Sequence, residues 1–244
     1  MKATAIDHDR LHGNHLAFFA THRGEVVRNR CCLAVKSERP EYQCAMLRAG
    51  CNVEHAKDES ATIHVLPSAL DQIPALEQLG YNHASGFSYM AFGADTSSWT
   101  VPSNVHVKKA ATPADIEDFS RIQGLAFAGE EHFAEWHPFL HKWNSRNADK
   151  PEHRFYVGYV DGDAVGTCLA LMHDRIVGLY AVGTLVNHRK KGIATVLMKQ
   201  AVDDALADGC EIVTLQVVTD SYAESFYKKL GFNTEFQVRI FKRG

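Results

Sequence analysis

The feature that most constrains this fold is a basic loop with a glycine, set between an apolar segment and an amphipathic one. The residues from Ile176 to Val186 are mostly apolar, and the loop after them reads Asn-His-Arg-Lys-Lys-Gly and ends at Gly192. Beyond it, apolar residues recur at the spacing of one helix face. They are Ala194, Leu197, Met198, Ala201, Val202 and Ala205. The pattern predicts a strand, a tight turn and a helix that ends at Asp208-Gly209.

The start of that helix is a predicted anion site. The first amides of a helix have no intrahelical acceptor and carry a partial positive charge, and Gly192 lets a ligand approach the backbone without meeting a Cβ. Basic side chains here oppose the helix dipole, which suits a helix whose end is filled by an anion. The predicted binding residues are Arg189, Lys190, Lys191, Gly192, Ile193, Ala194 and Thr195. An exposed basic turn without a ligand is the alternative.

A second cluster follows toward the C-terminus and reads Phe226-Tyr227-Lys-Lys-Leu230-Gly231-Phe232. It places the Tyr227 phenol on the apolar face of a short helix. Most tyrosines in such positions are core aromatics whose hydroxyl reaches water. The alternative is a general acid, because a phenol with a pKa of about 10 is protonated at neutral pH and can donate to a thiolate whose conjugate acid has a pKa of about 8.5.

Arg189-x-x-Gly192-x-Ala194 and the later Tyr227 cluster, in this order, resemble the GNAT superfamily of N-acetyltransferases. The resemblance implies an α/β fold with a mixed sheet, acetyl-CoA as cosubstrate and an amine as acceptor. It implies that the loop at residues 189–195 binds the pyrophosphate and that Tyr227 protonates coenzyme A. It also implies that the backbone of Thr184, Leu185 and Val186 contacts the pantetheine arm at a strand bulge, for which Gly183 is the candidate.

The group that deprotonates the amine is left open. An alkylamine with a pKa of about 10.4 must lose a proton before it attacks, which costs about 4–5 kcal/mol at pH 7. Many members of the family use a glutamate on the central strand, but residues 175–186 contain no carboxylate. The candidates are Glu130 or Glu131, His173, and Tyr180 through an ordered water. Asp220 is a second departure, because the family commonly has an asparagine there.

A turn-rich stretch at residues 93–104 reads as a linker. It separates a predicted N-terminal α/β region, residues 1–98, from a predicted GNAT domain, residues 105–244. Strands are predicted over 105–109, 153–160, 164–172, 176–186, 212–218 and 236–241. Besides the helix after Gly192 and the Tyr227 helix, one helix is predicted from the Thr112 cap to about Ala128, and another from about His132 to Trp143, interrupted by Pro138.

The N-terminal region contains a candidate internal repeat. Leu79-Gly80-Tyr81-Asn82 aligns with Leu230-Gly231-Phe232-Asn233, and the same offset lays residues 63–67 on residues 214–218. Leu76 then stands where Tyr227 stands. A repeat of this kind predicts an architectural region or a wall of the acceptor site, and not a second active centre; chance similarity is the alternative.

Charge and hydropathy argue against two classes of partner. The net charge of -3 is unlike the basic excess of a nucleic-acid-binding protein. The N-terminal residues have no apolar signal core, and no apolar run reaches transmembrane length. We expect a cytoplasmic protein that binds neither nucleic acid nor membrane.

Cysteines and histidines suggest no special chemistry. The six cysteines form no Cys-x-x-Cys pair, so free buried thiols are expected in place of disulfides. Among the 14 histidines, His137 and His141 are four apart, but no glutamate accompanies them in a zinc motif and Pro138 lies between them. No metal is expected.

The sequence therefore predicts an N-acetyltransferase that moves an acetyl group from acetyl-CoA to a primary amine of a small molecule or amino acid, by direct attack with Tyr227 as general acid. A homodimer is compatible with this function. Two other classes stay open: a non-catalytic acyl-CoA-binding sensor or structural module, and a protein-interaction module in which the pattern is vestigial.

Overall fold

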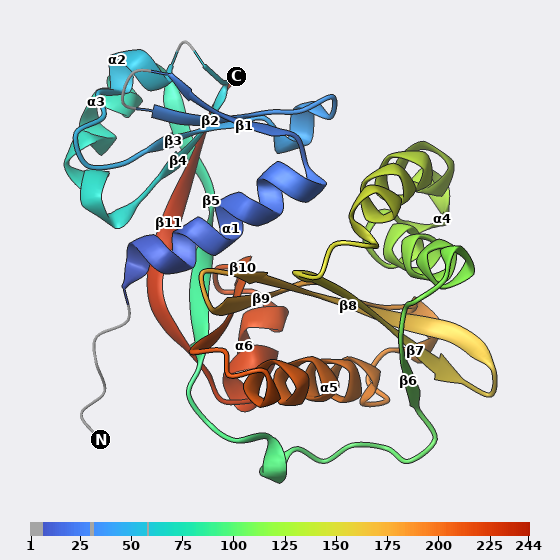
Figure 1. The fold of residues 1–244 in the computed structure, drawn as a ribbon. Helices are drawn as coiled ribbons and strands as arrows, with labels where there is room; N and C mark the ends of the chain where they lie inside the picture. Colours follow the sequence, from blue (N-terminus) through green and yellow to red (C-terminus); the bar gives the residue numbers. More distant parts are fainter. Residues whose placement is uncertain (1–6, 30–31, 58) are drawn as a thin grey trace. The chain divides into compact units, whose positions relative to one another are not determined.

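The computed structural model describes residues 7–29, 32–57 and 59–244 (Figure 1). The described chain divides into two compact units, each of which is described by itself. The first comprises the N-terminal part as far as Gly93 together with Gln216–Gly244, and the second comprises Ala94–Leu215.

The first unit is built on strands in the order β1-β2-β3-β4-β11-β5. Their bounds are β1 (Glu25–Asn29), β2 (Cys32–Lys36), β3 (Cys44–Leu47), β4 (Thr62–Val65), β5 (Tyr81–Phe92) and β11 (Phe232–Arg243). Only the β3–β4 pair is parallel among these ladders, and β5 and β11 pair along their whole length. The helices are α1 (His8–His22), α2 (Val53–Ala56), α3 (Ile73–Gln78) and α6 (Tyr222–Lys229).

The prediction of free cysteines is wrong for one pair. A disulfide joins Cys32 and Cys51 within the core of the first unit, whereas Cys44, Cys168 and Cys210 are free; Cys31 lies outside the described residues. Cys32 is on β2 and Cys51 precedes α2, so sheet pairing brings the two thiols together and no local spacing reveals it.

The candidate repeat has matching local structure on both sides. α3 is followed by Gly80 with φ of 82° and then β5, and α6 is followed by Gly231 with φ of 92° and then β11. Leu76 on α3 is fully buried, as a core residue should be. A common origin of the two segments stays a prediction.

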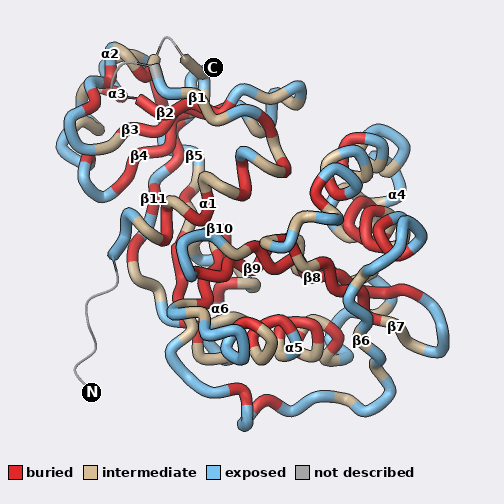
Figure 2. The backbone as a smooth tube through the Cα atoms, viewed as in Figure 1, coloured by how far each residue is buried: buried red, intermediate tan, exposed pale blue. Residues whose placement is uncertain are grey.

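The second unit has strands in the order β10-β9-β8-β7-β6, of which only β9 and β10 pair in parallel. Their bounds are β6 (His106–Lys109), β7 (His153–Val160), β8 (Asp163–His173), β9 (Ile176–Thr184) and β10 (Ile212–Val218), the last leaving the unit after Leu215. The helices α4 (Pro113–Asn147) and α5 (Ile193–Ala207) lie on opposite faces of these strands (Figure 1). Burial is concentrated along β8, β9 and the inner side of α5 (Figure 2).

Two glycines let α5 pack closely against this sheet. A Cβ on Gly166 would lie 2.7 Å from Ile193 Cγ2, and a Cβ on Gly158 would lie 3.3 Å from Leu197 Cδ1. The first turn of α5, where the anion site is predicted, is therefore held directly on β7 and β8.

Most of the predicted helices and strands are confirmed, with three corrections. Pro138 does not interrupt its helix: α4 breaks at Gly129, with φ of 74° and ψ of 175°, and its second half continues to Asn147. The predicted strand over 176–186 ends at Thr184, because Val186–His188 form a 3-10 turn, η4. In the first unit, the strand predicted over 236–241 is longer, because β11 begins at Phe232. The bulge between Thr234 and Phe236 interrupts the alternation of side chains, so the sequence pattern showed only the part of the strand after it.

The stretch predicted as a linker is packed against α5. It contains a 3-10 turn, η3 (Thr96–Ser98). The Thr96 hydroxyl donates a hydrogen bond of 2.5 Å to Asp203 and accepts one of 3.1 Å from Lys199, and Trp99 is buried. No helix in the described residues is long and apolar enough to cross a membrane.

Candidate active site

β9 carries a bulge near its end. The register with β8 shifts between Thr167 and Leu169, which leaves Ala181 and Val182 facing one residue of β8. Ala181 has φ of 48°, a conformation that is uncommon for a residue with a Cβ. The Thr167 hydroxyl donates a hydrogen bond of 2.8 Å to the Ala181 carbonyl and so stabilises the bulge. Gly183, the predicted bulge residue, instead pairs in register with Thr167.

β9 and β10 share only a short ladder. It joins Ile212–Thr214 to Ile176–Gly178, whereas β9 continues to Thr184. Within the second unit as described, the part of β9 after Gly178, including the bulge, has no ladder partner on β10. An extended ligand can pair with such a strand by adding to its open side, and Thr184, Leu185 and Val186 lie at its end.

The basic loop after β9 turns twice through the left-handed region. Lys190 has φ of 60° and Gly192 has φ of 78°, and such alternation turns successive N–H groups toward one concave side, as in an anion-binding nest. Gly192 is the N-cap of α5 and no side chain caps the helix. The first amides of α5, on Ile193, Ala194 and Thr195, therefore suit an anionic ligand.

Arg189 adds positive charge to the loop and also makes hydrogen bonds within the protein. Its Nε donates to the Thr184 carbonyl at 3.2 Å, and its Nη2 donates to the Ala126 carbonyl at 3.2 Å. The guanidinium thus ties the end of β9 to the end of the first half of α4. The sequence indicated its charge but could not indicate these two carbonyl partners.

Two positions at this site require glycine, because neighbouring side chains lie where a Cβ would be. A Cβ on Gly183 would lie 2.9 Å from Phe127 Cε2 and 3.0 Å from Ala126 Cβ, and one on Gly192 would lie 2.8 Å from Pro102 Cδ. The α4 helix covers the bulged strand at Gly183, and the packed stretch before β6 supports the loop at Gly192.

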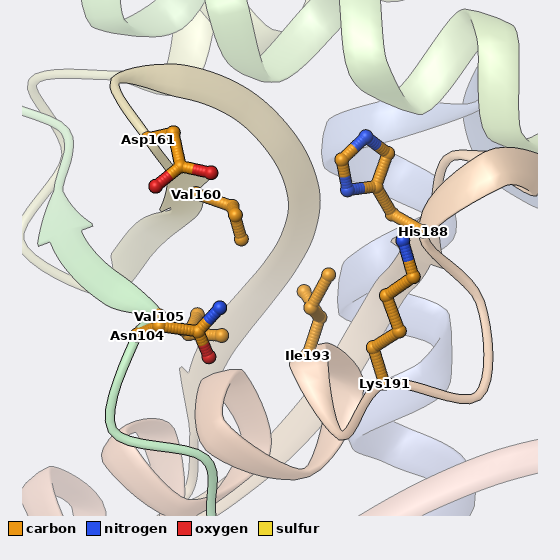
Figure 3. Close-up of a pocket in the computed structure, with 7 residues that line it drawn as sticks. All are labelled: Asn104, Val105, Val160, Asp161, His188, Lys191 and Ile193. Carbon is orange, nitrogen blue, oxygen red and sulfur yellow. The ribbon is translucent and has the colours of Figure 1, made fainter.

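A cavity of about 230 Å³ lies beside the loop (Figure 3). It is lined by Asn104, Val105, Val160, Asp161, His188, Lys191 and Ile193. His188 and Lys191 come from the basic loop, and Asp161 and Asn104 stand across from them (Figure 3). His188 Nδ1 is buried with no hydrogen-bond partner among the described residues. The cavity is below the ~300 Å³ of common small-molecule sites, so it fits a fragment of a long ligand.

The candidate bases lie at different places in the structure and differ in burial. His173 lies at the β8–β9 hairpin, about 25 Å along β9 from Thr184 at 3.3 Å per residue, so it is not brought to the loop. Glu130 and Glu131 are exposed just after the break at Gly129. Tyr180 is buried on β9 directly before the bulge.

Tyr227 lies on α6 in the first unit and is half-buried. Its ring packs edge-on against Phe232 at 6.1 Å and tilted against Phe226 at 5.3 Å. The buried Glu224, which no sequence motif indicated, fixes the start of the helix. Its carboxylate accepts hydrogen bonds of 2.7 Å from the Asp220 amide and 3.3 Å from the Thr234 hydroxyl.

The Glu224 carboxylate is held in its charged form. Burial raises the pKa of Glu224, but hydrogen bonds from Ser88, Lys228 and the Asp220 amide outweigh burial and hold that pKa below its ordinary value. Asp220 itself has φ of 59°, which aspartate tolerates better than most residues. Asp220 therefore forms part of the turn that leads into α6.

Known proteins share this sequence pattern and this fold. Residues 116–232 match the model of the acetyltransferase (GNAT) family, a range that includes both the basic loop and Tyr227. Comparison with curated protein sequences finds no match.

Solved structures of similar fold cover most of the chain. A GCN5-related N-acetyltransferase from Kribbella flavida has a TM-score of 0.70 at 16% identity, over 96% of this chain and 94% of that one. A functionally unknown conserved protein from Staphylococcus epidermidis has a TM-score of 0.63 at 14% identity, over 91% and 95%. A GCN5-related N-acetyltransferase from Sphaerobacter thermophilus has a TM-score of 0.60 at 20% identity, over 75% and 59%. Residues 116–232 therefore form an acetyltransferase domain of the GNAT family, and the chain as a whole shares the α/β fold of these solved structures.

Proposed function

We propose that the protein transfers the acetyl group of acetyl-CoA to a primary amine of a small molecule or amino acid, by direct attack in a ternary complex. The observation that carries the proposal is the sequence of bulged strand, left-handed basic loop and uncapped helix at residues 181–195. Its amides and charges suit a pyrophosphate, and its strand suits an extended arm.

Each part of the binding segment has a proposed role. The loop residues 189–195 bind the pyrophosphate through backbone amides, with Lys190 and Lys191 adding charge. The backbone of Thr184, Leu185 and Val186 pairs with the pantetheine arm and orients the thioester. Arg189 joins these two parts through its hydrogen bond to Thr184, and its hydrogen bond to Ala126 ties them to α4.

Two proton transfers complete the reaction. As the amine nitrogen bonds to the thioester carbon and the carbon–sulfur bond breaks, the Tyr227 hydroxyl protonates the departing thiolate. The amine proton passes to Glu130, or to water ordered by Tyr180. Tyr180 has the advantage of a fixed position beside the bulge, whereas Glu130 is at an exposed turn that an acceptor could order.

The N-terminal region, residues 1–98, is proposed to shape the acceptor site of the catalytic domain, residues 105–244. The cytoplasm supplies acetyl-CoA and is the proposed location. The proposed partners are acetyl-CoA and the amine, with neither nucleic acid nor membrane, and the protein is compatible with a homodimer.

Acetyl-CoA binding is tested by thermal unfolding with and without the ligand. A ligand at a hundredfold excess over its dissociation constant stabilises the folded state by about 2.7 kcal/mol. Wild type and Lys109→Glu, an exposed lysine of β6, should show the same rise in Tm. The rise should be strongly reduced in Lys190→Glu/Lys191→Glu. A folded wild-type protein with no rise would contradict the proposal.

A non-catalytic acyl-CoA-binding module is the second candidate, because β9 carries no carboxylate. Tyr227→Phe separates the two. For an enzyme, kcat should fall by about 10²–10⁴-fold, the usual contribution of a general acid, while the acetyl-CoA-induced rise in Tm is retained. Acetyl-CoA binding without turnover of any amine in either form would support the binding module.

A further inference from the structure

α4 is a helical hairpin whose two halves bring together a glutamate and two histidines. Glu117 lies on the first half, and His137 and His141 lie one turn apart on the second, after the break at Gly129. One donor atom from each lies within 4.8 Å of the others. We propose that these three side chains bind a divalent transition-metal ion, most suitably Zn²⁺, which joins the two halves of α4. This site is separate from the acyl-transfer chemistry proposed above and does not depend on it.

The distances between the donors match a metal site. His137 Nε2 lies 3.1 Å from Glu117 Oε1, and His141 Nδ1 lies 3.1 Å from Glu117 Oε2. Ligands at about 2.0–2.1 Å from a tetrahedral zinc are about 3.3 Å apart along each edge. Each histidine donor thus lies near this spacing from one oxygen of Glu117, and one donor atom from each of the three residues lies within 4.8 Å of the others. The three side chains can therefore close around one ion, with water in the fourth position.

The two ring nitrogens are not satisfied by the carboxylate. His137 Nε2 and His141 Nδ1 are both buried from solvent, and neither makes a hydrogen bond of acceptable geometry within the described part of the chain, although a Glu117 oxygen is near each. Buried imidazole nitrogens rarely stay without a partner. Such off-axis contacts are expected when donor atoms point at a common ion and not at one another.

The surroundings support the same arrangement. The other ring nitrogen of His141, Nε2, lies 3.3 Å from the Ser145 hydroxyl, the kind of outer contact that orients a metal-binding histidine. The His137 and His141 rings are stacked at 5.8 Å. Further along the hairpin, Asn144 donates to Ser120 at 3.0 Å and to Gln123 at 2.8 Å, so the halves are already fixed in register.

Donor chemistry selects the class of ion. Two imidazoles and one carboxylate suit Zn²⁺ and related first-row ions, whereas Mg²⁺ and Ca²⁺ prefer oxygen donors alone. His137 and His141 occupy positions i and i+4 of one helix face, the spacing with which paired histidines bind zinc. The glutamate that the sequence lacked beside them comes from the other half of the hairpin.

The test is metal titration of the chelator-treated full-length protein. Zn²⁺ is titrated calorimetrically into wild type, Glu117→Gln, His141→Gln and the control His132→Gln, an exposed histidine of the same half. Wild type and the control should bind one equivalent with the same affinity, and the other two variants should bind at least tenfold more weakly. Co²⁺ should give a visible band typical of four nitrogen and oxygen ligands without a thiolate charge-transfer band.

Two further measurements exclude trivial causes. Unfolding in the presence of chelator should give the same Tm for all four proteins, which shows that a lost affinity is not a lost fold. Hydrogen exchange of residues 130–147 should slow on adding Zn²⁺ to wild type but not to Glu117→Gln. No stoichiometric binding by wild type, or equal affinity in all four proteins, would overturn the proposal and leave adventitious binding by surface histidines.

Discussion

Single residues at this site act through close contact as much as through charge. Gly183 lets Phe127 and Ala126 of α4 lie on the bulged strand, and Arg189 joins the same helix to the strand end. Neither role follows from the residue type alone. The sequence predicted Gly183 as the bulge residue and Arg189 as a phosphate ligand. The contacts that both residues make in the structure are with α4, at residues more than fifty positions earlier in the chain.

Gly183→Ala should destabilise the protein. The new methyl group would lie 2.9 Å from the Phe127 ring, and overpacking of this kind costs about 1–3 kcal/mol. The free energy of unfolding in urea measures the loss. Gly13→Ala is the control, because that glycine lies inside α1 with no atom within 4 Å of its would-be Cβ, and alanine there favours the helix. Equal stability of Gly183→Ala and wild type would contradict this packing.

At the scale of elements, the start of α4 shows how local sequence positions a long helix. Thr112 and Asp115 form a capping box, with Pro113 in the first turn. The Asp115 carboxylate also accepts 2.5 Å and 3.0 Å hydrogen bonds from Lys108 and the Ala111 amide. Burial raises the pKa of Asp115, but these bonds outweigh it and lower the pKa to about 2.

Asp115→Asn should lower the free energy of unfolding at pH 7 by about 1–2 kcal/mol, through loss of a charged cap. Because the folded-state pKa is about 2 and the ordinary value is 3.8, the contribution is complete above pH 3.8 and is lost as the pH falls toward 2. Urea unfolding at pH 7 and pH 3 should therefore show a smaller difference between variant and wild type at pH 3. The exposed Asp149→Asn is the control, and an equal difference at both pH values would argue against the charged cap.

At the scale of the whole molecule, the first unit combines N-terminal segments with the C-terminal residues 216–244. Its core contains the Cys32–Cys51 disulfide, which closes a loop with a sequence separation of 19. A reducing compartment keeps such pairs as thiols and an oxidising one keeps them as disulfides, so the stability of this unit depends on the redox conditions.

Cys32→Ser/Cys51→Ser should lower the unfolding free energy of the oxidised protein by about 2–4 kcal/mol, since the cross-link restricts the unfolded chain. Denaturant unfolding without reductant measures this loss, and reduced wild type should approach the variant. Cys210→Ser, which removes a free and half-buried thiol, should leave the stability nearly unchanged. A full complement of free thiols in denatured, unreduced protein would show that the disulfide does not form.

The sequence by itself determined the features that a few neighbouring residues encode. The stripe from Ala194 to Ala205 predicted α5, Thr112-Pro113 predicted the start of α4, and the continuous apolar run predicted β10 over residues 212–218, all confirmed. The resemblance of this chain to the GNAT family was visible in the sequence for the same reason, because the two motifs that carry it are short and local. The roles of Tyr227 and of residues 189–195 stay predictions.

Only the tertiary structure decided the features that join distant parts of the chain. It placed the bulge at Ala181 under the Thr167 hydroxyl, gave Arg189 its carbonyl partners, paired Cys32 with Cys51, and brought Glu117 to His137 and His141. Spacing along the sequence carries no record of such pairs, because they form only when sheet register and helix packing bring the side chains within contact distance.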